Sequence, residues 1–290
     1  MKPAAFAYHP MKTLAETTAL LAELGDEGRI LAGGQSLVPL MNFRLAQPSH
    51  IVDINGVTEL AYIRRSGDRI AIGALARQAQ VERSDDVRRD VPLLAEALTW
   101  VAHPPIRHRG TVVGSIAHAD PAAELPAVAL ALAAQITIAS AGGSRTVPAE
   151  EFFVGPFSTV VGAGELVTEV TFPVAPPGSG HAFVEFARRH GDFAIAGAAV
   201  TLTLDGGTVG DARIVLCGVG PIPLRARGAE DTLRGAVPDE SVVAAAADAA
   251  VDGLEPSADI HGGSAYRVRV ARAQVLKAIS TAVERARVAR

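Results

Sequence analysis

The order of apolar and polar positions changes character along the chain. Residues 13–24 place apolar side chains at helical spacing, and Gly25 stands where such a helix would end. Two short apolar runs, 29–32 and 50–54, then predict buried strands, with a helix over 35–43 between them. This order is typical of a β-α-β unit, so we expect a parallel sheet near the N-terminus.

A hairpin pattern begins after Leu60. Strand-like segments at 61–64 and 69–72 flank a short polar turn, and a helix is predicted over 92–101. Further strand patterns are found at 135–140, 165–172, 182–187, 198–204 and 212–219. Alanine-rich helical patterns at 240–251 and 267–287 complete the chain.

Proline and glycine gather at 176–180, between two regions of different pattern, and we interpret this cluster as a linker. We therefore expect an N-terminal subdomain (1–57), a second subdomain (58–177) and a C-terminal domain (178–290). The mixture of a β-α-β start, hairpins and terminal helices indicates an α+β protein.

Composition narrows the possible functions. The 290 residues are 49% hydrophobic, enough for more than one core in a globular protein. The net charge is −4 and the basic residues are scattered, which argues against a nucleic-acid partner. Cys217 is the one cysteine, so this chain cannot form an internal disulfide or a four-cysteine metal or iron–sulfur site. Its apolar neighbours favour a small buried hydrophobe without a redox role.

Targeting signals are absent from the sequence pattern. The first residues lack the apolar core of a signal peptide. The longest apolar stretch, 125–139, is too short to cross a bilayer and contains Pro126 and Gln135. We expect a cytoplasmic protein without membrane insertion.

Two glycine-bearing segments carry the candidate chemistry. In the first, 32–36 (AGGQS), two glycines follow a predicted strand and would let backbone amides face a bound anion. In the second, 110–115, two glycines bracket a β-branched run, and Thr111 and Ser115 add hydroxyl donors. We expect both segments to be loops. Two amide-lined loops suit a diphosphate.

Each of these features also has a simpler structural explanation. The two glycines of the first segment could form an ordinary strand-to-helix turn. Ser36 and Ser115 could be helix caps, and Glu124 could be an exposed helix charge or an acceptor for a ligand hydroxyl. The spacing of all these residues behind the two loops favours contact with a ligand.

Histidines offer two further interpretations. His103, His108 and His118 are close in sequence, which raises the possibility of a metal site. Asp120 beside His118 raises the possibility of an acid–base pair, although a structural hydrogen-bonding role fits this stretch better. No serine nucleophile motif occurs. We therefore assign no metal ligand and no catalytic residue.

The chain resembles the FAD-binding medium subunit of the molybdenum hydroxylase superfamily, which includes xanthine dehydrogenase and carbon monoxide dehydrogenase. Segments 32–37 and 109–124 resemble its two FAD-diphosphate loops, 188–196 is similar to its Arg-x-x-Gly-Asp-aromatic-Ala stretch, and 266–267 fits its C-terminal helix. The resemblance covers nearly the whole chain. It implies a PCMH-type two-subdomain FAD-binding fold followed by a C-terminal domain with an antiparallel sheet plus helices.

The resemblance also implies one FAD per chain. We expect it to be noncovalent, because no histidine or cysteine stands in a flavin-linking motif. The candidate cofactor-binding residues are Leu31, Ala32, Gly33, Gly34, Gln35, Ser36, Leu37, Val101, His103, Gly110, Thr111, Val112, Val113, Gly114, Ser115, Ile116, His118, Asp120, Glu124, Asp192 and Phe193.

The implied activity is that of an oxidoreductase subunit. The resemblance implies that a [2Fe-2S] small subunit and a molybdopterin large subunit carry the remaining cofactors and are the partners of this chain in a dimer of heterotrimers. This chain would accept electrons from the iron–sulfur subunit and pass them to an external acceptor. The basic 188–190 segment is a candidate for part of that interface, or is simply a solvated charge cluster.

Two departures from the family pattern matter. Val113 stands where the family usually has glycine, so either its backbone keeps a negative φ or the segment approaches the diphosphate less closely. Phe193 stands where the family often has tyrosine, and this replacement keeps an apolar face and loses a hydroxyl.

Two other functions are possible alternatives. One is a free-standing FAD oxidase or dehydrogenase of the vanillyl-alcohol oxidase type, and the other is a cofactor-less binding scaffold.

Overall fold

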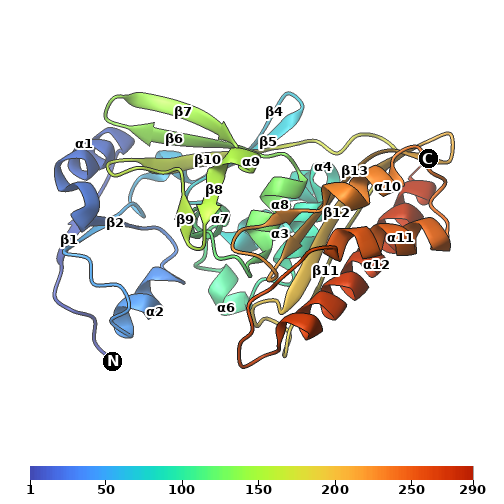
Figure 1. Ribbon diagram of the computed structural model, residues 1–290. Coiled ribbons are helices and arrows are strands. Elements are labelled where there is room, and N and C mark those ends of the chain that lie inside the picture. The colour runs from blue at the N-terminus through green and yellow to red at the C-terminus, as the bar shows by residue number, and fades with distance from the viewer. Residues whose placement is uncertain (290) are drawn as a thin grey trace.

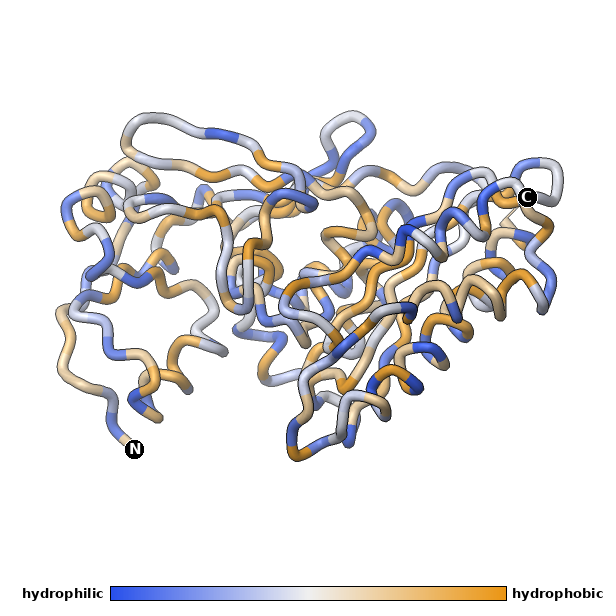
Figure 2. The backbone as a smooth tube through the Cα atoms, viewed as in Figure 1, coloured by the Kyte–Doolittle hydropathy of each residue, from blue (hydrophilic) through white to orange (hydrophobic). Residues whose placement is uncertain are grey.

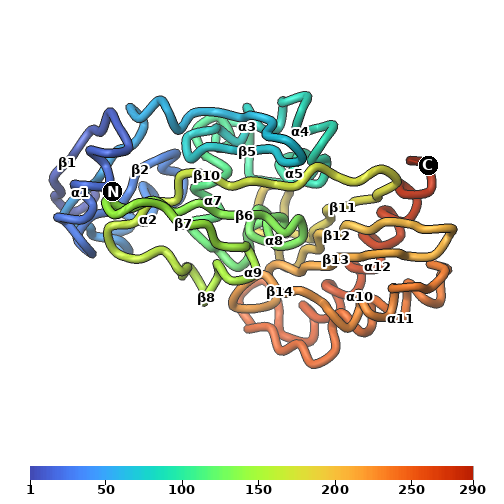
Figure 3. The backbone as a smooth tube through the Cα atoms, turned by 90° about the horizontal axis from the view of Figure 1, so that it is seen from above, coloured from blue at the N-terminus to red at the C-terminus, as the bar shows by residue number. Residues whose placement is uncertain are grey.

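The computed structural model describes residues 1–289 and contains three main sheets. Seen from above, the sheets follow one another along the long axis of the molecule, from the N-terminal part to the C-terminal helices (Figure 3). Helices pack beside each sheet (Figure 1). Within residues 1–289, no helix combines the length and the hydropathy that crossing a membrane requires.

The first sheet is parallel, as predicted. Its order is β1-β3-β2, and its strands are β1 (Ala7–Pro10), β2 (Gly28–Leu31) and β3 (His50–Asp53). The connections contain α1 (Leu14–Leu24), η1 (Gly25–Glu27) and α2 (Leu37–Asn42). The hydroxyl of Thr13 accepts the Glu16 amide at 3.2 Å and so caps α1. β1 was not predicted, because it is a short and mostly exposed strand.

The second sheet is antiparallel, with the order β4-β5-β10-β6-β7. Its strands are β4 (Ile63–Ser66), β5 (Arg69–Gly73), β6 (Gln135–Ser140), β7 (Gly143–Pro148) and β10 (Leu166–Pro173). A layer of short helices lies between β5 and β6 in sequence, and a small hairpin follows β7. The helices between β5 and β6 are α3 (Gln78–Arg83), α4 (Asp85–Asp90), α5 (Pro92–Leu98), α6 (Pro104–Arg107), α7 (Val112–His118) and α8 (Glu124–Ala131). The short η2 (Thr58–Leu60) precedes β4, and α9 (Ala149–Phe152) and the hairpin of β8 (Phe153–Gly155) and β9 (Ser158–Thr159) follow β7.

The third sheet is antiparallel, with the order β11-β12-β13-β14. Its strands are β11 (Ser179–Phe186), β12 (Ala196–Asp205), β13 (Thr208–Cys217) and β14 (Leu224–Arg225). The helices of this part are α10 (Arg227–Leu233), α11 (Glu240–Val251) and α12 (Ser264–Val288). The C-terminal antiparallel sheet with helices is therefore as predicted. The predicted linker is shorter than expected, since β11 already begins at Ser179.

Both faces of the third sheet are buried, which explains its apolar strands. Ala198, Val200 and Ile214 face the core that α11 and α12 cover. Ala199 and Val215, on the opposite face, join the core of the second subdomain. The orange colour of these strands shows the same concentration of apolar residues (Figure 2). One sheet therefore joins the two cores.

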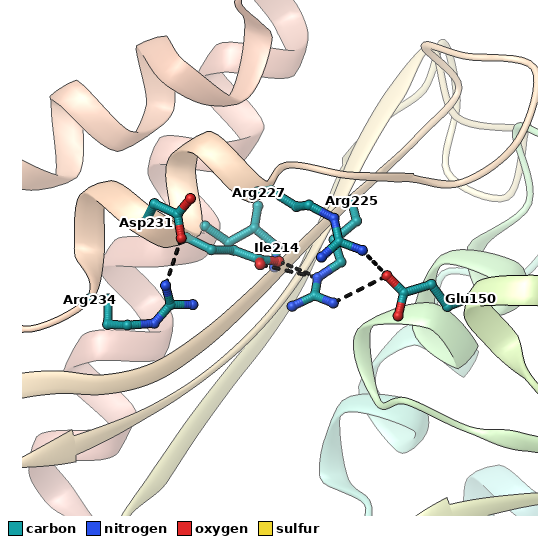
Figure 4. Close-up of polar contacts among 7 residues, drawn as sticks. Glu150, Ile214, Arg225, Arg227, Asp231 and Arg234 are labelled. Atoms are coloured by element: carbon teal, nitrogen blue, oxygen red, sulfur yellow. Dashed lines mark hydrogen bonds and ion pairs between the residues drawn. The ribbon is translucent and has the colours of Figure 1, made fainter.

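Ion pairs also connect the C-terminal part to the second subdomain. Arg225 donates to the buried Glu230 at 2.9 Å and to Glu150 of α9 at 3.4 Å, and Arg227 also bonds Glu150 (Figure 4). The carboxylate of Glu230 accepts the amide of Ile214 at 3.0 Å as well. These contacts hold β14 and α10 against α9.

Candidate functional site

A cavity of about 580 Å³ is lined by residues that lie in or next to each of the three main sheets. Its size falls within the range of small-molecule and cofactor sites. The predicted site residues that line it are Ala32, Gly33, Gly34, Gln35, Ser36, Leu37, Val101, Gly110, Thr111, Val113, Gly114, Ser115, His118, Asp120, Glu124 and Phe193. The fold thus brings the two glycine-bearing segments and the distant Phe193 to one hollow.

The first glycine segment packs directly against the second. A Cβ atom on Gly33 would lie 2.5 Å from the carbonyl oxygen of Arg109 and 2.7 Å from the Cα of Gly110. Gly34 has a φ of +72°, which L side chains rarely adopt. The two glycines are therefore needed for different reasons: one for close approach and the other for backbone conformation.

The second segment is a helix start, where the pattern predicted a loop. Thr111 is the N-cap of α7, and its hydroxyl accepts the Gly114 amide at 3.0 Å. Val112 and Val113 are buried, so packing favours the helix over the weak helix propensity of valine. Val113 has helical backbone, and glycine is not required at this position. Of the other first-turn amides, that of Val112 donates to the carbonyl oxygen of Ala76 at 3.4 Å, and that of Val113 has no intrahelical acceptor.

Two polar residues that the sequence analysis missed connect these segments. Asn55 donates to the carbonyl oxygen of Ala32 at 2.9 Å and accepts from Arg77 at 2.6 Å. The other guanidinium nitrogen of Arg77 donates to the carbonyl oxygen of Arg109 at 2.6 Å. These hydrogen bonds connect the first glycine segment to the second, in addition to the direct contact between the glycines. No local motif marks Asn55 or Arg77, because the bonds join residues far apart in sequence.

Acidic and imidazole groups form one wall of the cavity. Burial lowers the pKa of His118, while the charge of Asp120 acts in the opposite direction. Asp120 accepts the amide of Ala122 at 2.9 Å, a local structural bond. Burial raises the pKa of Glu124, at the start of α8, to about 7. Glu124 is therefore a buried residue of the cavity wall and not an exposed helix charge.

Some predicted residues do not line the cavity. These are Leu31, His103, Val112, Ile116 and Asp192. Val112 and Ile116 lie one turn apart on the face of α7 that enters the core, and both are fully buried. His103 is exposed next to Gly191, where a Cβ would lie 2.7 Å from its ring. Within residues 1–289, no three metal-ligating side chains come together.

The cavity also contains groups that the sequence analysis did not select. Gln78 is buried, and its side-chain oxygen has no hydrogen-bond partner. Phe157 lines the cavity with a φ of +53° and packs against the ring of His118 at a centroid distance of 5.2 Å. A non-glycine residue at positive φ is costly and indicates local constraint.

These features fit FAD. The glycine segments offer backbone amides at a point where side chains are absent, which suits a diphosphate. Glu124 and the unpaired oxygen of Gln78 offer acceptors for ligand hydroxyl or N–H groups. Phe193 is 60% exposed yet lines the cavity, so it presents an aromatic face to an occupant.

Family models match both halves of the chain. Residues 4–175 match the FAD binding domain in molybdopterin dehydrogenase, and residues 181–282 match the CO dehydrogenase flavoprotein C-terminal domain. The chain is 48% identical to the 6-hydroxypseudooxynicotine dehydrogenase complex subunit alpha of Paenarthrobacter nicotinovorans, over 99% of this chain and 97% of that protein.

Solved structures agree with this assignment. A chain of carbon monoxide dehydrogenase from Hydrogenophaga pseudoflava superposes with a TM-score of 0.96 at 41% identity, over 98% of this chain and 99% of that one. A chain of quinoline 2-oxidoreductase from Pseudomonas putida 86 gives 0.95 at 40% identity, over 99% of both chains. The predicted fold class is confirmed. The chain belongs to the family of FAD-binding subunits of molybdenum hydroxylases, and it is an oxidoreductase component.

Proposed function

We propose that this chain is the FAD-carrying medium subunit of a molybdenum hydroxylase, and that it accepts electrons from a [2Fe-2S] subunit and delivers them to an external acceptor. The observation that carries the proposal is the contact of Gly33 with Gly110, which joins two amide-bearing segments at one cavity. Cys217 is buried in the core, so this chain has no cysteines for an iron–sulfur cluster of its own.

The residues of the cavity would divide the binding of FAD among them. The segments 32–36 and 111–115 would hold the diphosphate, Glu124 would accept from a ribityl hydroxyl, and Phe193 would pack on the flavin ring. FAD supplies the conversion between two-electron and one-electron transfer. The protein positions the cofactor noncovalently and tunes its surroundings.

The partners follow from this role. An iron–sulfur small subunit and a molybdopterin large subunit would complete the enzyme as a dimer of heterotrimers in the cytoplasm. Arg188, Arg189 and His190 are exposed on the loop that leads to Phe193, so they are placed to contact the iron–sulfur partner. Relatives are named for carbon monoxide, caffeine and 6-hydroxypseudooxynicotine, and we therefore assign the choice of substrate to another subunit.

The three structural parts would serve this arrangement. We propose that residues 1–57 and 58–177 are the two FAD-binding subdomains, each contributing one glycine segment. Residues 178–290 would form the flavoprotein C-terminal domain, which closes the cavity with Phe193. The beginning of the second family match at residue 181 supports the last boundary.

A tagged chain expressed in its source organism tests the proposal. We expect it to purify with a cysteine-rich subunit and a large subunit, with iron and molybdenum present and one FAD per chain. Acid precipitation should release all the flavin. An active monomeric flavoenzyme without iron or molybdenum would favour the vanillyl-alcohol oxidase type, and a colourless complex would favour a cofactor-less scaffold.

A further inference from the structure

Glu185 of β11 is buried, and both of its carboxyl oxygens are unpaired. In the C-terminal sheet it lies opposite Gly197, which in turn lies opposite Cys217. A Cβ on Gly197 would be 2.7 Å from the sulfur of Cys217 and 3.1 Å from the Cβ of Glu185. Because position 197 has no side chain, Glu185 and Cys217 have room above the middle strand.

Glu124 approaches the same region from the cavity side. It begins α8, which packs on β12 and β13, and its carboxyl lines the cavity. Glu124 is 4% exposed and Glu185 is 7% exposed. Among residues 1–289, neither carboxyl forms an ion pair with a lysine, an arginine or a histidine. Two carboxyl groups thus share one water-poor region without a cation.

Other titratable groups face the pair or lie on the elements packed around it. From α5, Glu96 is bonded by Arg285 at 2.6 Å, and His181 of β11 lies 3.7 Å from the same carboxylate. From β13, Cys217 presents a thiol whose pKa is raised by burial. Asp120, at the cavity, acts on Glu124.

A buried carboxylate without a cation is costly, so such a group favours its protonated form. Burial, together with the charge of Glu124, raises the pKa of Glu185 to about 8. The pKa of Glu124 itself is raised to about 7. The two carboxyls therefore lose their protons in two coupled steps around neutral pH.

We propose that Glu185 is a positioning residue that acts through Glu124, and that the two carboxyls form a buried acid pair that controls the charge of the cavity wall. The inference rests on the proposed function only in taking FAD as the ligand. With both protons bound, the pair adds no charge to the wall and Glu124 can both donate and accept a hydrogen bond. After both protons leave, the wall repels the anionic diphosphate.

The dissociation constant of FAD from the full chain, measured from about pH 6 to about pH 9, tests this. FAD binding to the wild-type chain should weaken in two steps as the pH rises. In Glu185→Gln only the step that belongs to Glu124 should remain. The total weakening should be about tenfold smaller in the variant, because one of the two negative charges no longer forms. Glu185→Met provides a second variant if the amide disturbs folding, and the exposed Glu151→Gln is the matched control.

Infrared spectroscopy of the same proteins separates this inference from the proposed function. The infrared bands of protonated carboxyl groups, recognised by their shift in D₂O, should disappear as the pH rises. They should disappear in two steps in wild type and in one step in Glu185→Gln, with or without FAD. If the chain binds no FAD but shows two steps, the acid pair stands and the proposed function fails. If Glu185→Gln and Glu185→Met have the wild-type pH profiles for FAD binding and infrared absorption, the acid pair is refuted.

Discussion

Gly33 and Gly110 meet so closely that a Cβ atom on Gly33 would lie 2.7 Å from the Cα of Gly110. This contact joins the strand-to-helix turn of the first sheet to the residue that precedes the α7 cap. Because both partners are backbone atoms, no side-chain rotation can relieve an added methyl group. The relative position of the two segments therefore depends on a missing side chain.

Gly33→Ala should accordingly abolish FAD retention. The added carbon would separate the two segments and widen the proposed diphosphate site, while the three sheets remain intact. Flavin absorbance per chain after gel filtration measures the effect. Gly142→Ala is a matched control, because a Cβ there would meet only the Ser140 hydroxyl at 3.7 Å. Equal flavin content in the two variants would show that this contact does not shape the site.

Gly114→Ala should also lower FAD affinity, through a different contact. A Cβ at this position would lie 2.6 Å from the Thr111 hydroxyl that caps α7. Loss of such a cap costs about 1 kcal/mol. Thr111→Ala loses the same cap without adding a carbon, so a larger defect in Gly114→Ala isolates steric blocking. Ser36→Ala should be milder, with FAD binding at most about tenfold weaker, as for one neutral hydrogen bond. Titration of apoprotein with FAD gives all three values.

Arg77→Lys should weaken FAD binding although Arg77 does not line the cavity. Its two guanidinium nitrogens bond Asn55 and the carbonyl of Arg109, and a lysine nitrogen cannot span both acceptors. Asn55→Ala should have a similar effect, and the double variant should be less than additive because both act in one network. Arg83→Ala is the control, because Arg83 is exposed at the end of α3, the helix that follows Arg77. Strict additivity of the two changes would contradict a shared network.

The sequence predicts the order of the sheets and locates the two glycine segments, because both depend on local patterns. The parallel β-α-β start and the C-terminal strands follow from apolar runs that end at glycine or proline. The helix at 112–118 could not be predicted in this way, since two valines favour a strand until their burial is known. The Asn55–Arg77 bonds and the Glu124–Glu185 pair depend on tertiary contacts, for which one sequence carries no signal.

Arg225→Ala should destabilise the protein far more than Arg227→Ala. Arg225 pairs with Glu230, whose side chain is 2% exposed, so its removal leaves a buried carboxylate with one amide donor. Breaking a buried pair in this way costs about 3–5 kcal/mol. Arg227 is 64% exposed, and its pair with Glu150 contributes about 0–1 kcal/mol. Urea unfolding measures both, and equal destabilisation would contradict this ranking.

The stability of the FAD-free chain should decrease as pH rises from about 5 to about 8, and Glu185 should account for part of the loss. In the unfolded chain, the Glu124 and Glu185 carboxyls ionise near the ordinary glutamate pKa of 4.5. In the folded chain their pKa values are raised to about 7 and about 8. Between these limits the folded state binds more protons than the unfolded state, so raising the pH favours unfolding.

Glu185→Met removes one of these two groups and should therefore gain stability relative to wild type as the pH rises. Urea unfolding at about pH 5 and about pH 8 measures this difference. It should be larger at the higher pH, because there the unfolded wild-type chain has released the Glu185 proton that the folded state still holds. Glu151→Gln should follow wild type at both values, since Glu151 is exposed. A Glu185→Met effect that is the same at both pH values would mean that Glu185 is not protonated in the folded protein.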